Sequence, residues 1–250
     1  MFIKNLLKKI ILPILHVIRK VLSVLKNHCL PISSPSPLAP PNSFSFDMYE
    51  KEELERSYNH FKKYFKTSIF LQRKAIREYS IKKAIDYDKN LEKTYLEFGV
   101  YLGGTIDIFS KYVKKIYGFD SFEGLREDWT GFKRHPKGLF NLNRKIPKLN
   151  KNVIPVVGWV QDTLPQFLKK HKPAINFVHM DMDTYETSKY ILTELKPYIS
   201  KNCIILFDEL YNFAGWDIGE YKALTEVFNE NEYKFLAFSE DYHQATTQIL

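Results

Sequence analysis

The feature that most constrains the fold is an alternation of short apolar runs and helical segments that begins near residue 94. Five apolar runs predict buried strands: TYLEFG, KIYGFD, VIPVVG, INFVHMD and CIILFD. Helical patterns are found over Thr105–Lys114, Leu164–Lys170, Tyr185–Tyr198 and Glu220–Asn229. The runs YKFLAFS and HQATTQIL predict a final antiparallel pair. Repeated strand–helix units predict an α/β protein with a doubly wound, mainly parallel sheet and helices on both faces.

We expect four segments along the 250 residues, a length that suits one large α/β domain with additions. Residues 1–30 predict a basic amphipathic helix, and residues 31–46 predict a stiff, proline-rich linker. Residues 47–90 carry a charged helical pattern that predicts a cap of two helices. Residues 91–250 contain the predicted strands and form the domain in which we expect the active site.

The basic charge of the chain is concentrated at its N-terminus. The net charge is +8, and residues 1–46 contain six Lys or Arg and no Asp or Glu, which leaves +2 for the rest by subtraction. Apolar residues within 2–27 recur at helical spacing opposite the lysines, a pattern that suits an anionic membrane surface. A helix packed on the domain and an organellar transit peptide also fit the pattern. Charge interrupts the apolar residues before they reach the length of a membrane span.

Composition also bears on partners and compartment. The body of the chain has no zinc-finger spacing and no basic-aromatic RNA-binding signature, so we expect no nucleic-acid partner. The two cysteines, Cys29 and Cys203, do not form a disulfide framework and favour a reducing compartment. We therefore expect a cytoplasmic protein, which is peripheral at the membrane face if its N-terminal helix is an anchor.

Two features that flank the third predicted strand have two interpretations each. Residues 124–152 form a long connection rich in Lys and Arg. A connection of this length is either a lid whose cations meet an anionic group or a solvated run of charge. Trp159 follows the third strand, where it either borders a bound ligand or belongs to the core.

The first and second predicted strands end in residues that suit a nucleoside-containing ligand. The first ends in Glu97, Gly99 and Gly103, an E-x-G-x-x-x-G pattern in which glycine allows a sharp turn and a close ligand approach. A tyrosine replaces the middle glycine of the G-x-G-x-x-G dinucleotide fingerprint. The second strand ends in Asp120 and Ser121, and an acidic residue there can accept both ribose hydroxyls of an adenosine.

Two acidic pairs, 27 residues apart, follow the fourth and fifth predicted strands. The first is Asp181 with Asp183, and the second is Asp208 with Glu209. Carboxylates at the ends of buried strands are costly unless they are paired, hydrogen-bonded or bound to a metal. Strand alternation places His179 on the same face as Asp181. Asp183 is interpreted as a cap of the helix that follows it, whereas the other three acids indicate a functional site.

Five segments in order resemble class I S-adenosylmethionine-dependent methyltransferases, and the closest resemblance is to the macrocin O-methyltransferase-like branch. These segments are EFGVYLGGTI, YGFDSFEGL, VVGWVQDTLP, HMDMDTYETS and FDELYNFAGWDIGEYKA, and the resemblance covers about residues 90–250. It implies a Rossmann-like doubly wound sheet of seven strands with an antiparallel terminal strand, here preceded by an N-terminal helical extension. It also implies S-adenosylmethionine as the methyl donor.

The resemblance implies a role for each cofactor-binding motif. The methionine end of the donor would be lined by the first motif, the ribose would be bound by the second, and the adenine would lie beside the third. The corresponding residues are Glu97, Gly99 and Gly103, then Asp120 and Ser121, and finally Trp159.

The resemblance further implies a divalent cation held by Asp181, Asp208 and Glu209, with Glu209 standing where the family often has aspartate. Hard oxygen ligands of this kind suit Mg²⁺. A substrate hydroxyl on that ion becomes more acidic and is held in place. Asp181 is the first candidate to take the hydroxyl proton, and His179 is the second.

We therefore expect an S-adenosylmethionine-dependent O-methyltransferase, assisted by a divalent metal, that acts on a hydroxyl of a sugar, a glycan or a related small molecule. Two alternatives remain open. One is a metal-independent N- or C-methyltransferase of the same fold, and the other is a non-catalytic, membrane-attached cofactor-binding protein. The identity of the acceptor and the presence of a homo-oligomer do not follow from the sequence.

Overall fold

The computed structural model describes residues 44–131 and 135–250. Phe46–Leu250 form one compact unit. The predicted amphipathic helix at 1–30 and most of the predicted linker lie outside the described residues. Within the described ranges, no helix combines the length and apolar character needed to cross a membrane.

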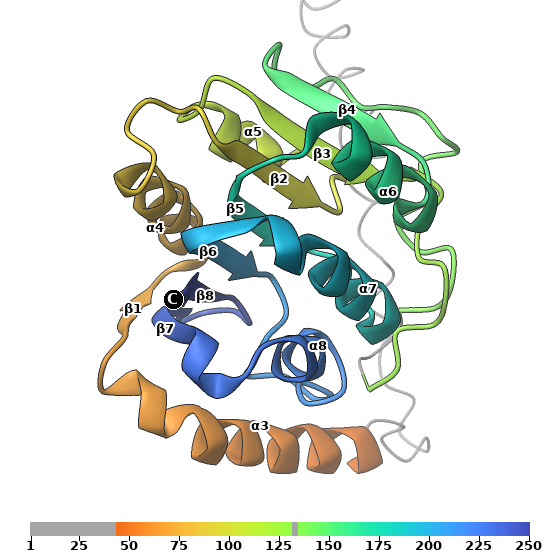
Figure 1. Ribbon diagram of the computed structural model, residues 1–250. Helices are drawn as coiled ribbons and strands as arrows, with labels where there is room; N and C mark the ends of the chain where they lie inside the picture. The colour runs from red at the N-terminus through yellow and green to blue at the C-terminus, as the bar shows by residue number, and fades with distance from the viewer. Residues whose placement is uncertain (1–43, 132–134) are drawn as a thin grey trace, which may run out of the picture. The chain divides into compact units, whose positions relative to one another are not determined.

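Eight strands form a single sheet in the described part of the chain, in the order β1-β7-β8-β6-β5-β2-β3-β4 (Figure 1). Strand β8 runs antiparallel to both of its neighbours, and the other neighbouring pairs are parallel. The strands are β1 (Ile69–Leu71), β2 (Thr94–Phe98), β3 (Ile116–Asp120), β4 (Val153–Val157), β5 (Ile175–Met180), β6 (Ile199–Phe207), β7 (Tyr233–Ser239) and β8 (Ala245–Ile249).

The predicted mainly parallel sheet and its final antiparallel pair are confirmed, but the sheet has one strand more than the seven predicted. The additional strand is β1, which lies between two helices where the sequence predicts only helix. It has three residues, and Ile69 and Phe70 are both exposed at the edge of the sheet. A strand of three residues is too short to show an alternation of apolar and polar residues, and it forms because it pairs with β7.

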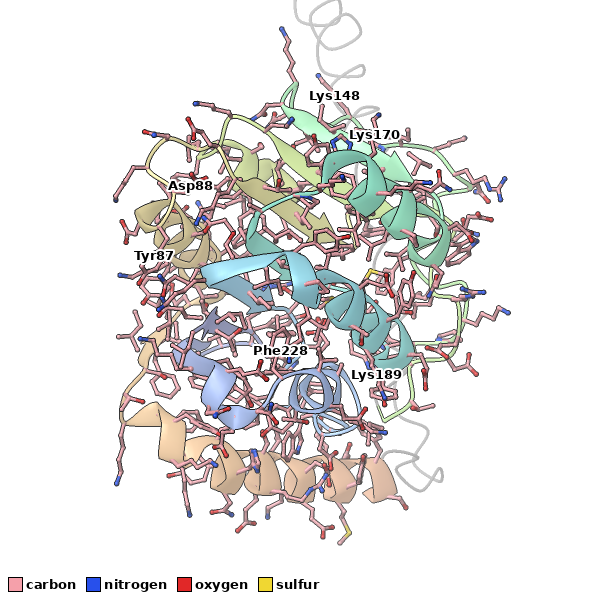
Figure 2. All side chains as sticks on the ribbon, viewed as in Figure 1. Tyr87, Asp88, Lys148, Lys170, Lys189 and Phe228 are labelled. Atoms are coloured by element: carbon pink, nitrogen blue, oxygen red, sulfur yellow. The ribbon has the colours of Figure 1, made fainter. Side chains whose placement is uncertain are left out.

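Helices cover both faces of the sheet, as predicted. The buried side chains of α3, α6, α7 and α8 belong to one apolar core, and those of α4 and α5 belong to a second core on the opposite face. Figure 1 shows α6, α7 and α8 side by side on one face, and Figure 2 shows side chains filling the space between helices and sheet. The helices are α3 (Phe44–Phe65), α4 (Arg73–Asp86), α5 (Ile106–Ser110), α6 (Val160–His171), α7 (Tyr185–Leu195) and α8 (Glu220–Val227).

Alternation along the central strands β2 and β5 places polar side chains on the face covered by α4 and α5. In β2, Tyr95 packs in the core of that face and Leu96 packs in the opposite core, so Glu97 returns to the first face. His179 of β5 is paired with Glu97 in the register, and its ring contacts Phe109 of α5. The fold therefore aligns ionisable groups beneath the carboxyl ends of the strands, where ligands bind in sheets of this type.

Candidate active site

A cavity of about 500 Å³ opens at the carboxyl ends of the central strands. Most of the residues predicted to form the site line this cavity: Gly99, Asp120, Ser121, Trp159, Asp181, Asp208 and Glu209. Three predicted residues, Glu97, Gly103 and His179, do not line it. Glu97 and His179 are fully buried instead.

The turn after β2 is held against the ends of the neighbouring strands. The Gly99 N–H donates to the Phe119 carbonyl at 3.0 Å, and the Asp181 N–H donates to the Phe98 carbonyl at 3.0 Å. Gly99 has a positive φ of +88°, and a Cβ added to it would overlap the Asp181 carbonyl oxygen. Only glycine fits both the conformation and this contact. The glycine turn and Asp181 are therefore positioned by one another.

Asp120 at the end of β3 fixes the same turn. Its Oδ2 accepts the N–H groups of Val100 at 2.9 Å and Tyr101 at 2.7 Å, and its Oδ1 accepts the Phe122 N–H at 2.6 Å. A carboxylate has about four acceptor positions, so about one remains for a ligand. The role of Asp120 toward a ribose stays a prediction, and its bonds in this structure leave it about one acceptor position for that role.

The connection after β3 forms one wall of the cavity, which favours the lid interpretation over a wholly solvated segment. Its contribution consists of Gly124, Leu125, Arg126, Trp129, His135 and Phe140. Trp159 lines the cavity and lies outside both apolar cores. The Arg126 guanidinium lies 5.6 Å from the centre of the Trp159 ring system. This pair forms the end of the cavity where an adenine is predicted.

Beneath the cavity, His179 lies between two buried carboxylates. Its Nδ1 is 3.6 Å from Glu97 Oε1, and its Nε2 is 3.4 Å from Asp208 Oδ1. Burial lowers the pKa of His179, but the two carboxylates outweigh it and raise that pKa to about 8. Burial also raises the pKa of Glu97. His179 has no contact with the cavity, so it is placed to orient Asp208 and not to abstract a proton from a substrate.

We expect the metal-free protein to lose stability as the pH rises from about 6.5 to about 8. Because the folded-state pKa of His179 lies above its unfolded value, the folded state binds more protons in this window. The contribution of His179 is complete below pH 6.5 and amounts to about 2 kcal/mol. The raised pKa values of Asp183 and its neighbours add a slope of the same sign at lower pH. Chemical denaturation in chelator between pH 6 and 9 measures it. His179→Gln should flatten the slope, whereas His171→Gln at an exposed histidine should retain it, and equal slopes in all three proteins would contradict the assignment.

Asp208 is held by donors from three separate elements. Its Oδ1 accepts Arg77 Nη2 from α4 at 3.0 Å and the side-chain amide of Gln244, the residue before β8, besides the contact with His179. Burial alone would raise the pKa of Asp208, but His179 and Arg77 hold that pKa well below its usual range. Asp208 is thus an ionised carboxylate with one oxygen already engaged. The sequence motifs gave no indication of Arg77 or Gln244.

Asp183 lies among the other acids and does not cap a helix. Thr184 occupies the N-cap position of α7, and Asp183 precedes it with a φ of +62°. Burial, followed by the charges of Asp208 and Asp120, raises the pKa of Asp183 to about 7. The interpretation of Asp183 as a helix cap is therefore wrong. The left-handed backbone turns this residue away from the helix start, so local capping preference does not decide its role.

The carboxylates form two overlapping groups that could each hold a cation. Oxygens of Asp181, Asp183 and Glu209 lie within 4.8 Å of one another. The ligand atoms of a second group, His179, Asp181 and Asp208, lie within the same distance of one another. The predicted ligands Asp181, Asp208 and Glu209 are thus divided between the two groups. Burial and neighbouring acids raise the pKa of both Asp181 and Glu209 well above the usual range. The Glu209 Oε2 is buried without a hydrogen-bond partner.

Glu220, at the start of α8, holds the backbone of Glu209 through a hydrogen bond. Its Oε2 accepts the Glu209 N–H at 3.1 Å, and its side chain is fully buried. The segment that contains it forms part of the last motif of the resemblance, but no local pattern marked Glu220 as part of the site. Burial raises its pKa well above the usual range, and the neighbouring acids act in the same direction.

Residues 96–210 match a family model described as a methyltransferase domain. This match shows that the chain contains a methyltransferase domain, and the sheet and the cavity at its carboxyl edge are consistent with the class I S-adenosylmethionine-dependent fold. A comparison with curated proteins finds no match.

Two solved structures share the fold. One is CalS11, described as a calicheamicin methyltransferase, with a TM-score of 0.55 and 21% identity over 86% of this chain and 87% of that chain. The other is an apo structure of CalS11, described as a TDP-rhamnose 3'-O-methyltransferase, with a TM-score of 0.51 and 20% identity over 86% of this chain and 88% of that chain.

Proposed function

We propose that the protein is an O-methyltransferase that acts on a hydroxyl of a sugar, a glycan or a related small molecule, with assistance from a divalent cation. One observation carries the proposal: the glycine turn, Asp120 and Trp159 line the same cavity as the carboxylates that follow β5 and β6. A donor site and a cluster of hard oxygen ligands therefore share one space. The description of CalS11 as a TDP-rhamnose methyltransferase supports a sugar as the acceptor.

Several residues that line the cavity suit the methyl donor. Gly104 lines it, and a Cβ added there would meet nothing within 4 Å, so the missing side chain leaves room beside the turn. Asp120 retains about one acceptor position for a ribose hydroxyl. Trp159 and Arg126 offer flat surfaces to an adenine. When bound, S-adenosylmethionine supplies the sulfonium methyl group.

The carboxylates fit a divalent cation in number and in chemistry. Oxygens of Asp181, Asp183 and Glu209 lie within 4.8 Å of one another, and Arg77 offsets only part of the charge at Asp181, so neighbouring acids oppose ionisation within this group. Mg²⁺ prefers such oxygen ligands, and when bound it acidifies a coordinated hydroxyl. Asp208 can add its Oδ2, since its described donors all use Oδ1.

The residues of the chain then have separable roles. Asp181 belongs to both carboxylate groups and lines the cavity, so it is the best placed acid to accept a hydroxyl proton. Arg77 and His179 hold Asp208 ionised and fixed. Gly99 joins the cofactor turn to Asp181, so the acceptor and donor surfaces keep one relative position. Alignment of this kind supplies much of the rate of an in-line methyl transfer.

Two measurements test the proposal. Calorimetry should detect binding of S-adenosylmethionine, and a methyl-transfer assay over a panel of glycans and nucleotide sugars should yield an O-methylated product. Absence of cofactor binding would contradict the donor site. Cofactor binding combined with transfer to nitrogen or carbon acceptors alone would contradict the O-methyltransferase assignment.

We expect Trp159→Ala to weaken S-adenosylmethionine binding by about 5- to 100-fold, because loss of a ring stacked on a base costs about 1–3 kcal/mol. Calorimetry on wild type and variant measures this change. Tyr58→Ala is the control, because Tyr58 is 59% exposed and does not line the cavity. Equal affinity of the Trp159 variant and wild type would place the adenine elsewhere.

A further inference from the structure

Helix α4 directs two arginines toward the cavity from one of its faces. Arg73 and Arg77 are four residues apart, one helical turn, and both line the cavity. Arg77 is engaged with Asp208 at 3.0 Å. Arg73 belongs to no salt bridge between described residues. One arginine of the pair therefore contacts the acidic cluster, and the other lines the cavity without a salt bridge to a described residue, although its charge also acts on Asp241.

The Arg73 side chain has a defined position although it is exposed. Its guanidinium carbon lies 3.8 Å from the centre of the Tyr242 ring, and Tyr242 also lines the cavity. Two hydrogen bonds connect the start of α4 to the turn that carries Tyr242. The Arg73 N–H donates to Asp241 Oδ1 at 2.8 Å, and the Glu240 N–H donates to the Leu71 carbonyl at 2.9 Å. Stacking on an aromatic face leaves the N–H edge of the guanidinium free for a ligand.

We propose that Arg73 and Tyr242 form a binding site for an oxyanion, a carboxylate or a phosphate, inside the cavity. A guanidinium offers paired N–H donors in the geometry that such groups accept. The nearby Asp208 does not oppose an anion with its full charge, because Arg77 and His179 already compensate it. Two ligands carry the required group: the methionine carboxylate of S-adenosylmethionine, or a diphosphate on the acceptor. The second source rests on the proposed function.

Calorimetry on the full chain with three probes tests the proposal: S-adenosylmethionine, decarboxylated S-adenosylmethionine and inorganic pyrophosphate. We expect Arg73→Met to lower the affinity for an oxyanion ligand by about 10- to 100-fold, which is the usual loss when a hydrogen bond to a charged group is removed. If the partner is the methionine carboxylate, the variant loses affinity for S-adenosylmethionine and binds the decarboxylated analogue as wild type does. If the partner is an acceptor diphosphate, the variant loses only pyrophosphate binding.

Three further variants separate the site from general effects on the helix. Lys74→Met removes the adjacent exposed charge, which does not line the cavity, and should bind all probes as wild type does. Tyr242→Phe retains the stacking ring and should have little effect, whereas Tyr242→Leu should weaken the same probe as Arg73→Met. Unchanged affinity of Arg73→Met for every probe would overturn the site. A protein that binds these probes through Arg73 but methylates no hydroxyl would contradict the proposed function alone.

Discussion

Gly99→Ala should lower the free energy of unfolding by about 2–5 kcal/mol and reduce methyl transfer at least about 100-fold. A left-handed backbone costs an alanine about 1–2 kcal/mol, and relief of a core overlap costs about 1–3 kcal/mol more. The overlap is with the Asp181 carbonyl oxygen, so relief displaces the residue proposed to ligate the cation. A displacement of about 1 Å is enough to cost about 100-fold in rate. Chemical denaturation and a methyl-transfer assay measure the two effects.

Gly104→Ala is the matched control for Gly99→Ala. Gly104 lies in the same turn and lacks a positive φ, and its added Cβ would meet nothing within 4 Å. Its free energy of unfolding should therefore stay within about 0.5 kcal/mol of wild type. If Gly99→Ala were as stable as Gly104→Ala, the close approach of the turn to Asp181 would be incorrect.

Most of the fold could be predicted because its signals are local. The parallel strands are continuous apolar runs, and helical segments separate them at lengths that suit a doubly wound sheet. Strand β1 could not be predicted, because its three residues acquire strand structure from pairing with β7, which lies more than 160 residues away. The position of β8 between β6 and β7 is equally a result of pairing and not of local pattern.

The same distinction applies to the candidate site, where some residues could be predicted from local patterns and others could not. Asp120, Trp159 and the acids that follow β5 and β6 could be predicted, because each stands at the end of a recognisable strand. Arg77 and Gln244 could not, since they reach Asp208 from 131 and 36 residues away. Gln244 faces Asp208 only because β8 pairs with β6 so that Ala245 is opposite Phe207. Side chains that fix the charge state of the site thus depend on register, which the sequence pattern does not define.

Removal of divalent cations by a chelator should reduce methyl transfer at least about 100-fold, and added Mg²⁺ should restore it. Loss of Lewis-acid assistance costs several kcal/mol, and each 1.36 kcal/mol is a factor of ten in rate. Asp181→Asn should cause a loss of similar size that Mg²⁺ does not restore, because Asp181 belongs to both carboxylate groups. Asp162→Asn is the control, since Asp162 is exposed and lies outside the cavity lining.

Metal affinity distinguishes the two carboxylate groups from one another. If the ion is held by Asp181, Asp183 and Glu209, Asp183→Asn should weaken Mn²⁺ binding, measured by electron paramagnetic resonance, about 10- to 100-fold. Asp208→Asn should instead act mainly on stability, because it leaves Arg77 buried without its partner, at a cost of about 3–5 kcal/mol. A normal rate in chelator would contradict the role of a metal.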